Sequence, residues 1–192
     1  MAMRARTLLL VRHGSTPAVR RAAFPLDEPL DVTARSAAAA AAESIGTVDA
    51  AYTSPARAAV GTALALGTDP VVEPALTDCD PGRWRGRTLA DVQEAEPDAL
   101  ADWLADPDAA PHGGENLTSV SLRVGAWLDM QRHLPPGRFV AVTHAAPIKA
   151  AAAYVLGLTH EATTRLDIAP LSVTEVSIRG GRWRLVRWNS RL

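Results

Sequence analysis

The sequence predicts an α/β fold: a three-layer sandwich with a mostly parallel central sheet, helices on both faces and an antiparallel C-terminal hairpin. Strand-like and helix-like segments alternate along most of the 192 residues. The first strand candidate, 7–11, is apolar on both faces, which is typical of an interior strand of a covered parallel sheet. Near the C-terminus, two alternating segments flank Gly180-Gly181, which favours a hairpin with a two-residue turn.

The elements after the first strand follow from local signals. Residues 17–30 hold three prolines and no clear period, so a loop is expected there. Asp31 is an N-cap candidate for a helix over 32–45, with Gly46 just past its end. A second short strand is expected over 48–52.

The middle of the chain begins with a helix in which Pro55 takes the first helical position and which ends near Leu66. Another short strand is expected at 71–72. Residues 76–114 lose the regular pattern, so they are expected to be short helices and loops that form a lid or substrate-specificity segment. The chain as a whole, 1–192, is interpreted as one domain.

The rest of the chain continues the alternation before the closing hairpin. The expected elements are a helix over 117–133, a strand over 138–142, a helix over 147–156, and hairpin strands over 173–178 and 183–188.

Composition excludes several classes of protein. Hydrophobic residues make up 47% of the chain and charged residues 21%, which excludes an intrinsically disordered chain. The formal net charge of -1 argues against a nucleic-acid-coating protein. The single cysteine, Cys79, cannot form an internal disulfide, and no apolar run is long enough for a spanning helix. We therefore expect a cytoplasmic protein with no membrane or nucleic-acid partner; its oligomeric state stays open.

Three expected strand ends carry polar side chains of an unusual kind. Arg12, His13, Gly14 and Thr16 follow the first strand, and Ser54 follows the second, with Arg57 one turn later. His144 follows the fourth strand. Ligands of open α/β sheets bind beyond the carboxyl ends of the strands, so these residues can meet in one crevice. Two histidines and two arginines make a cationic pocket, and the planar fork of arginine suits phosphate.

The histidines favour catalysis in addition to binding. A neutral imidazole is a good nucleophile, so His13 could attack phosphorus while the other cationic groups stabilise the equatorial oxygens. Gly14 would permit close backbone approach to the phosphate. The leaving alkoxide needs a proton, for which Asp78 and Asp80 are both candidates. A metal site is disfavoured because the adjacent arginines repel a cation, and no cofactor is expected.

Five ordered segments resemble those of the histidine phosphatase superfamily, which has the phosphoglycerate mutase-like fold. They are Leu10-Val11-Arg12-His13-Gly14-Ser15-Thr16, Thr53-Ser54-Pro55-Ala56-Arg57-Ala58, the block 76–86, Gly113-Gly114-Glu115-Asn116, and Val142-Thr143-His144. Together they span nearly the whole chain. A lone Arg-His-Gly would be a weak signal, whereas five blocks in the right order are specific.

The resemblance implies a role for each matching residue. His13 is the implied nucleophile, and Arg12, Arg57 and His144 are the implied phosphate pocket. Asp78 stands where the family usually has its glutamate proton donor. The implied substrate-binding positions also include Gly14, Thr16, Ala145 and Glu115.

Three departures from the family pattern accompany these assignments. Aspartate at 78 is one methylene shorter than glutamate, Ala145-Ala146 follows the second histidine where glycine is common, and Arg85 stands where glutamate is frequent. Asp78 can still donate a proton if burial raises its pKa. The amide of Ala145 can still reach a phosphate if its φ is negative.

The resulting hypothesis is metal-independent hydrolysis of a small phosphorylated metabolite through a phosphohistidine on His13, with Asp78 as proton donor. One alternative is phosphoryl transfer of the phosphoglycerate mutase type, although 192 residues favour the phosphatase. Another alternative is a non-catalytic phospholigand-binding module. His112 is interpreted either as a residue of the pocket mouth or as part of a surface loop, and Cys79 as incidental.

Overall fold

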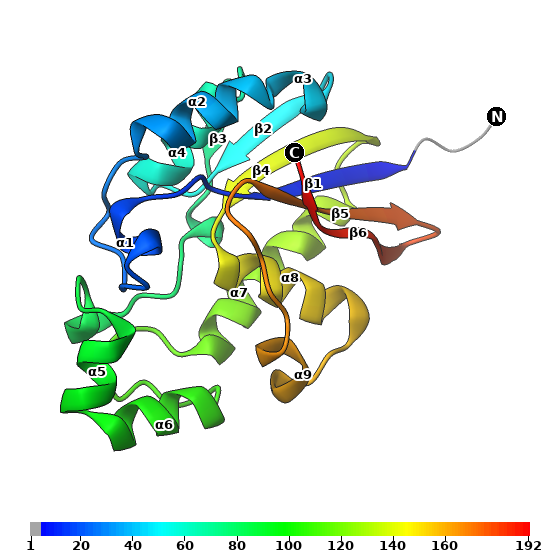
Figure 1. Cartoon of the computed structure of the whole chain (residues 1–192). Helices are drawn as coiled ribbons and strands as arrows, with labels where there is room; N and C mark the ends of the chain where they lie inside the picture. Colours follow the sequence, from blue (N-terminus) through cyan, green and yellow to red (C-terminus); the bar gives the residue numbers. More distant parts are fainter. Residues whose placement is uncertain (1–4) are drawn as a thin grey trace.

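The computed structural model describes residues 5–192 and contains a six-stranded sheet in the order β3-β2-β4-β1-β5-β6 (Figure 1). The strands are β1 (Arg6–Arg12), β2 (Ala50–Thr53), β3 (Pro70–Val72), β4 (Gly137–Thr143), β5 (Ser172–Arg179) and β6 (Arg182–Arg191). The first four pair in parallel, whereas β5 pairs with β1, and β6 with β5, in the antiparallel sense. This mixed sheet confirms the predicted fold class.

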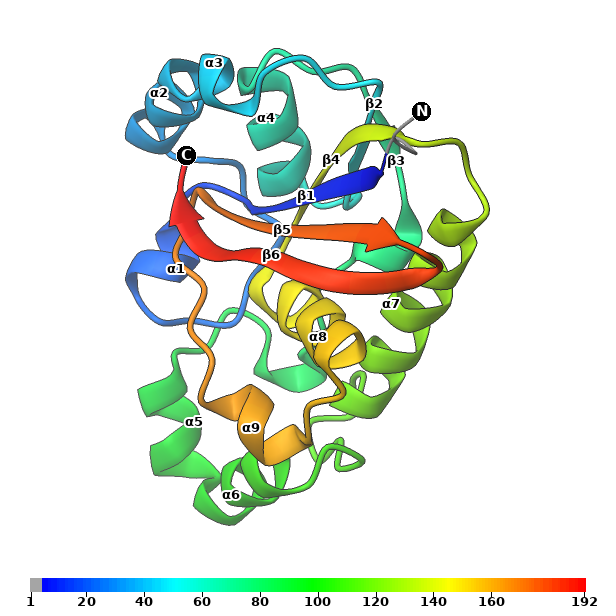
Figure 2. The same cartoon turned by 90° about the vertical axis from the view of Figure 1, so that its right-hand side faces the viewer.

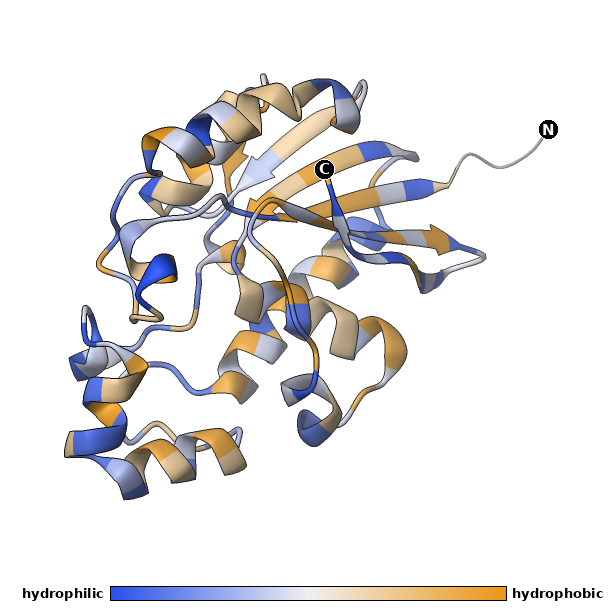
Figure 3. Ribbon diagram, in the orientation of Figure 1, coloured by the Kyte–Doolittle hydropathy of each residue, from blue (hydrophilic) through white to orange (hydrophobic). Residues whose placement is uncertain are grey.

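Two layers of helices cover the sheet (Figure 2). On one face lie α2 (Val32–Ala40), α3 (Ala42–Ile45) and α4 (Arg57–Ala65); on the other lie α7 (Leu117–Arg132) and α8 (Ala145–Leu156). Successive side chains of a strand point to opposite faces of the sheet, so β1 contributes to the cores on both faces. Its Leu8 and Leu10 pack with the α7 and α8 side, whereas Leu9 and Val11 pack with the α2 and α4 side. Apolar residues accordingly run along the central strands (Figure 3).

The closing hairpin is confirmed and is longer than predicted. Gly180 and Gly181 have φ of 58° and 73° and connect β5 to β6. Two consecutive residues with positive φ make the turn type whose twist matches that of the strands, and glycine adopts it without strain. The basic residues of β6 lie on the last strand of the sheet, and charge on an edge strand opposes the addition of another strand.

The predicted lid segment, 76–114, begins at the end of the 3-10 turn η1 (Pro74–Leu76). It contains the 3-10 turn η2 (Gly82–Trp84) and the helices α5 (Leu89–Ala95) and α6 (Pro97–Ala105). The two helices lie away from the sheet (Figure 1) and have a small core of their own, made of Trp84, Val92 and Leu100. Backbone hydrogen bonds of Phe24 with Gly86 and Arg87 tie this segment to the residues that follow α1. Its role as a lid stays a prediction.

Two predictions in the N-terminal part are wrong in detail. Residues 17–30 are not all loop, because Pro17–Arg20 form helix α1, capped by the hydroxyl of Thr16. A Thr-Pro pair starts a helix well, since proline suits the first helical position. The helix expected over 32–45 begins at its predicted cap, Asp31, but divides at Ala41, after which the short α3 buries Ile45.

Three further predictions are corrected around the strand ends. Pro55 is not helical, because α4 begins at Arg57, after the Ser54 hydroxyl has bound the amide of Ala56. Helix α8 begins at Ala145, two residues before the predicted start, with His144 as its N-cap. An additional helix, α9 (His160–Thr164), follows α8 and is capped by the side chain of Thr159.

Candidate active site

The sheet register brings the two histidines together. Arg12 is paired with Thr143 across the parallel strands β1 and β4, and the amide of His13 donates to the carbonyl of Thr143. The next residue on each strand is therefore a histidine, and the ring centroids of His13 and His144 lie 4.9 Å apart. Both rings line a cavity of about 340 Å³ beyond the strand ends, together with Arg12, Thr16 and Asp78. We name it the strand-end cavity.

His13 is held in the state that a nucleophile requires. Its Nδ1 lies 2.7 Å from the carbonyl of Gly14 and donates to it, which leaves the lone pair on Nε2. Burial, the neighbouring His144 and the charge of Arg12 together lower the pKa of His13 to about 4, although the Gly14 carbonyl and Asp78 oppose this. The imidazole is therefore neutral at neutral pH, with one nitrogen free to attack.

Ser54 orients the second histidine. The Ser54 hydroxyl oxygen accepts the amide of Ala56 at 3.3 Å and lies 2.8 Å from Nε2 of His144, to which it donates its proton. The ring proton of His144 is then on Nδ1, which is buried and has no hydrogen-bond partner among the described residues. Burial and the charges of Arg12 and Arg123 lower the pKa of His144 to about 3. Nδ1–H is thus available as a donor to a phosphoryl oxygen.

The two candidate proton donors occupy different environments. Asp78 lines the strand-end cavity, with an Oδ2 that lies 3.6 Å from Nδ1 of His144, and burial raises its pKa despite the nearby His13. Asp80 is more than half exposed, forms an ion pair with Arg85 and accepts the amide of Gly82. That amide and Arg85 lower the pKa of Asp80. Only Asp78 therefore has both the position and the raised pKa of a general acid.

Arg123 holds the segment that carries Asp78. Its guanidinium donates to the carbonyl oxygens of Ala75 and Asp78 at 2.7 and 3.1 Å. It also forms a two-pronged ion pair with Glu115, at 2.8 and 2.9 Å. Glu115, expected to touch substrate, lies outside the lining of the strand-end cavity and instead anchors Arg123. The sequence reasoning did not assign Arg123, which lies on α7, eight residues after Glu115.

Backbone amides add to the anion-binding character of the cavity. Ala145 lines it and occupies the first position of α8, whose first amides have no partner within the helix. Ala145 is helical, so its φ is negative. Its amide can therefore reach a phosphate although the residue is not glycine. Arg12 also lines the cavity, and its guanidinium donates to the carbonyl of Ile168, which fixes its direction.

Two predicted residues are placed differently from expectation. Gly14 does not approach the cavity: its amide donates to the Thr62 hydroxyl, and a Cβ there would lie 3.1 Å from both Leu30 and Ala34. Its lack of a side chain serves helix packing. Arg57 is exposed and outside the cavity lining, although its backbone amide donates to Asp27. The cavity rim instead contains the carboxylates of Asp27 and Glu28, which the sequence reasoning missed.

A second, larger cavity of about 720 Å³ adjoins the first. We name it the helix-lined cavity, because α6, α7, α8 and α9 supply most of its wall. His112 belongs to this wall and is only 2% exposed, so its interpretation as a surface loop residue is wrong. The imidazole accepts the amide of Gly114 and stacks edge-on against Trp84, which buries it. Cys79 also lines it; burial raises the pKa of its thiol to about 12, which keeps it protonated.

Within residues 5–192, no group of three His, Cys, Asp or Glu side chains is arranged to hold a metal ion. None of the helices in the same range has the length and hydropathy that a membrane crossing requires.

Comparison with known proteins points to one family. Residues 8–191 match the family described as the histidine phosphatase superfamily, branch 1. The solved structure of a mycobacterial glucosyl-3-phosphoglycerate phosphatase in complex with VO3 superposes with a TM-score of 0.86 and 31% identity, over 97% of this chain and all of that one.

Two relatives in sequence extend this comparison. A glucosyl-3-phosphoglycerate phosphatase of Mycolicibacterium vanbaalenii is 31% identical over 98% of this chain and 96% of its own length. A bifunctional protein of Mycobacterium tuberculosis is 32% identical over 88% of this chain, but the match spans only 50% of that protein. The chain thus covers about half the length of some of the curated relatives that it matches.

Proposed function

Because the chain belongs to the histidine phosphatase superfamily, we propose that it hydrolyses phosphomonoesters of small metabolites through a phosphohistidine on His13. The observation that carries this proposal is the pairing of a neutral His13, whose Nε2 is free, with an Asp78 whose pKa is raised in the same cavity. A nucleophile without its proton and an acid with its proton are the two groups that the first step needs.

The first step transfers the phosphoryl group to the enzyme. Nε2 of His13 forms a bond to phosphorus while the bond between phosphorus and the ester oxygen breaks. The proton of the Asp78 carboxyl passes to that oxygen, so the alcohol leaves neutral and Asp78 becomes a carboxylate. Arg12, Nδ1–H of His144 and the first amides of α8 stabilise the charge on the three phosphoryl oxygens.

The second step returns the enzyme to its starting state. Water attacks the phosphorus of the phosphohistidine, the bond between nitrogen and phosphorus breaks, and Asp78 takes the proton from the water. Inorganic phosphate leaves, and His13 and Asp78 regain their initial protonation. No metal or cofactor takes part in either step of this proposal.

The test is phosphate release from an aryl phosphate and a panel of sugar and sugar-acid phosphates, in a buffer that contains a chelator. Wild type is compared with His13→Ala and with His133→Ala, which removes an exposed histidine at the end of α7 as a matched control. We expect release by the wild type and by the control variant, and none by His13→Ala.

A second measurement identifies the intermediate. Rapid mixing with substrate, followed by alkaline denaturation and peptide mass analysis, is expected to locate a phosphoryl group on the peptide that contains His13. Release that survives in His13→Ala would contradict the proposal. If His13 is labelled without phosphate release, and an added acceptor such as a phosphorylated sugar acid removes the label, the chain would be assigned to phosphoryl transfer instead. Phosphate binding without labelling would identify a binding module.

A further inference from the structure

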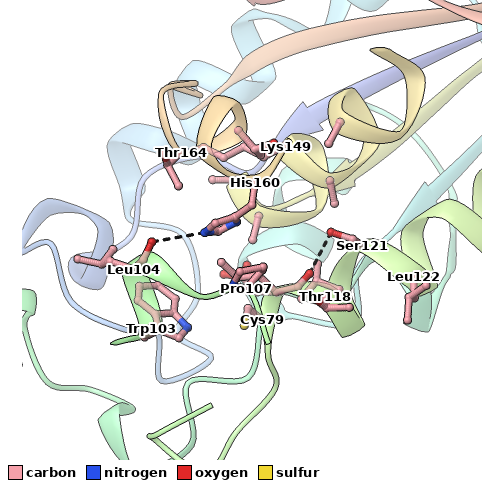
Figure 4. A pocket seen from close by; sticks show the side chains of 18 of the residues that line it. Cys79, Trp103, Leu104, Pro107, Thr118, Ser121, Leu122, Lys149, His160 and Thr164 are labelled. Atoms are coloured by element: carbon pink, nitrogen blue, oxygen red, sulfur yellow. Dashed lines mark hydrogen bonds between the residues drawn. The ribbon is translucent and has the colours of Figure 1, made fainter. Parts of the chain in front are cut away.

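The helix-lined cavity has a wall that is mostly apolar (Figure 4). Trp103 and Leu104 come from α6, Leu122 from α7, and Ala150 and Ala153 from α8. Its volume of about 720 Å³ lies within the range of pockets that enclose a small organic molecule.

Most of the polar side chains in this wall already have partners. The hydroxyls of Ser121, Thr163 and Thr164 each donate to a carbonyl three or four residues earlier in their own helix. The hydroxyl of Tyr154 donates to Asp129. A sugar that entered this cavity would lose its hydrogen bonds to water and find few replacements, which costs free energy for each hydroxyl left unpaired.

Among the described residues of this wall, the buried ring nitrogens Nε1 of Trp103 and Nε2 of His112 have no partner, and Lys149 adds an unpartnered ammonium group. It is half-buried, and within residues 5–192 no hydrogen bond or ion pair engages its Nζ. Burial lowers its pKa, Asp167 raises it and Arg12 lowers it further. It is also the only lysine in the chain. An ammonium group that borders an apolar cavity without a protein partner is suited to an anionic group on a ligand.

The helix-lined cavity and the strand-end cavity share part of their lining. Asp78 and Ala145 line both of them, so the proposed proton donor stands where the two meet. A phosphate ester bound at His13 would therefore direct its alcohol toward the helix-lined cavity. Lys149 lies four residues after Ala145 on α8, which places it one helix turn, about 6 Å, farther along.

We propose that the helix-lined cavity binds the alcohol part of the substrate, and that this alcohol is an apolar, aryl-sized body with one anionic group that pairs with Lys149. This inference rests on the proposed phosphatase function and adds the chemical class of the substrate. It separates this chain from an enzyme built for polyhydroxylated phosphates, because the wall offers one cation and few free hydrogen-bonding groups.

The test compares kcat/KM for three esters: 4-carboxyphenyl phosphate, its neutral isostere 4-carbamoylphenyl phosphate, and glucose 6-phosphate. In the wild type we expect the carboxylate to exceed the carboxamide by about tenfold or more, the usual worth of a hydrogen bond to a charged group. In Lys149→Met we expect this ratio to fall to about one. Arg35→Met removes the same charge from the exposed side of α2 and is expected to keep the wild-type ratio.

A cavity-filling variant tests the apolar part independently. Ala153→Leu narrows the helix-lined cavity without reaching the strand-end cavity. We expect it to raise KM for both aryl esters several-fold, while the inhibition constant of inorganic phosphate changes less than twofold. Glucose 6-phosphate as good a substrate as the aryl esters would overturn the apolar assignment, and a carboxylate-to-carboxamide ratio of one in the wild type would overturn the role of Lys149.

Failure of the proposed function is distinguishable from failure of this inference. If the wild type hydrolyses none of the esters, calorimetric binding of 4-carboxyphenyl phosphate is measured for the wild type and Lys149→Met. Binding that weakens about tenfold in the variant supports the cavity assignment in a protein that is not a phosphatase. Equal binding by both proteins, or binding by neither, overturns the inference.

Discussion

The two cavities differ in how the chain builds them. The strand-end cavity takes its two histidines from the residues that follow β1 and β4, where sheet register sets their spacing, and Asp78 from the loop after η1. The helix-lined cavity takes its wall from α6, α7, α8 and α9, which reach it by side-chain packing. The first is lined by two histidines, Arg12 and three carboxyl side chains, and the second is mostly apolar with a single lysine.

This difference separates the reaction from the choice of substrate. Backbone hydrogen bonds between strands hold His13 and His144 close together, and such a constraint tolerates little change. Helix packing is less restrictive, because side chains on one helix face can change size while the helix remains in place. In the proposed function, the phosphoryl chemistry takes place at the carboxyl ends of β1 and β4, and the surrounding helices select the substrate.

The largest expected effect is the loss of the nucleophile. His13→Ala should lower kcat by about 10⁴-fold or more, as removal of a nucleophile does in other hydrolases. The loss should be equal for every ester, whichever alcohol the helix-lined cavity receives. Steady-state phosphate release measures it. A loss that varied with the alcohol would show that His13 also selects the substrate.

Asp78→Asn should lower kcat by about 10²- to 10⁴-fold for alkyl esters and less for esters with acidic alcohols, because a good leaving group needs no proton.

In the wild type, kcat should fall as the pH drops through about 4, where His13 gains a proton, and again as the pH rises through the raised pKa of Asp78, where the donor ionises. The variant should keep the acid limb and lose the alkaline one. An unchanged alkaline limb would refute the role of Asp78.

The lid core gives an effect on stability. Leu100 is 1% exposed and packs with Trp84 and Val92, so Leu100→Ala should lower the free energy of unfolding by about 2–5 kcal/mol. Because this core supports α6, KM for aryl esters should rise more than the inhibition constant of inorganic phosphate. Leu64→Ala changes an exposed side chain of α4, so its free energy of unfolding should stay within about 0.5 kcal/mol of wild type; it is the control for chemical denaturation.

Ser54→Ala tests a positioning residue. Without the hydroxyl proton at Nε2, His144 can adopt either tautomer and no longer holds its Nδ1–H toward the phosphate. We expect kcat to fall by about tenfold with little change in KM, the worth of one hydrogen bond. A KM change alone would indicate a structural role. Ser44→Ala, an exposed serine in α3, is the matched control.

The smallest expected effect is that of Asp80→Asn. Asp80 is exposed and bound to Arg85, so kcat should stay within about twofold of wild type, as for most surface substitutions. The same assay with Asp78→Asn provides the contrast. A larger loss from Asp80→Asn than from Asp78→Asn would reverse the assignment of the donor.

The sequence alone determined the α/β class and the residues at the sheet edge. Short apolar strands followed at once by Arg12-His13 and by His144 predict where those side chains lie, because parallel strands end at a common edge. The sequence also predicted a helix cap correctly, since Asp31 is the N-cap of α2. These features depend on neighbours along the chain, or on a register that the apolar pattern itself sets.

Only the tertiary structure gives Asp78 and Asp80 different environments, pairs Glu115 with Arg123 and leaves Arg57 exposed. These outcomes depend on how the loops that carry the residues pack against the strands and helices, which decides which side chains face a cavity. Lys149 is an example. The sequence pattern of α8 does not distinguish it, and its half-buried position in the wall of the helix-lined cavity results from the helices that pack around it. Burial and partners, which set pKa and availability, exist only once the chain has folded.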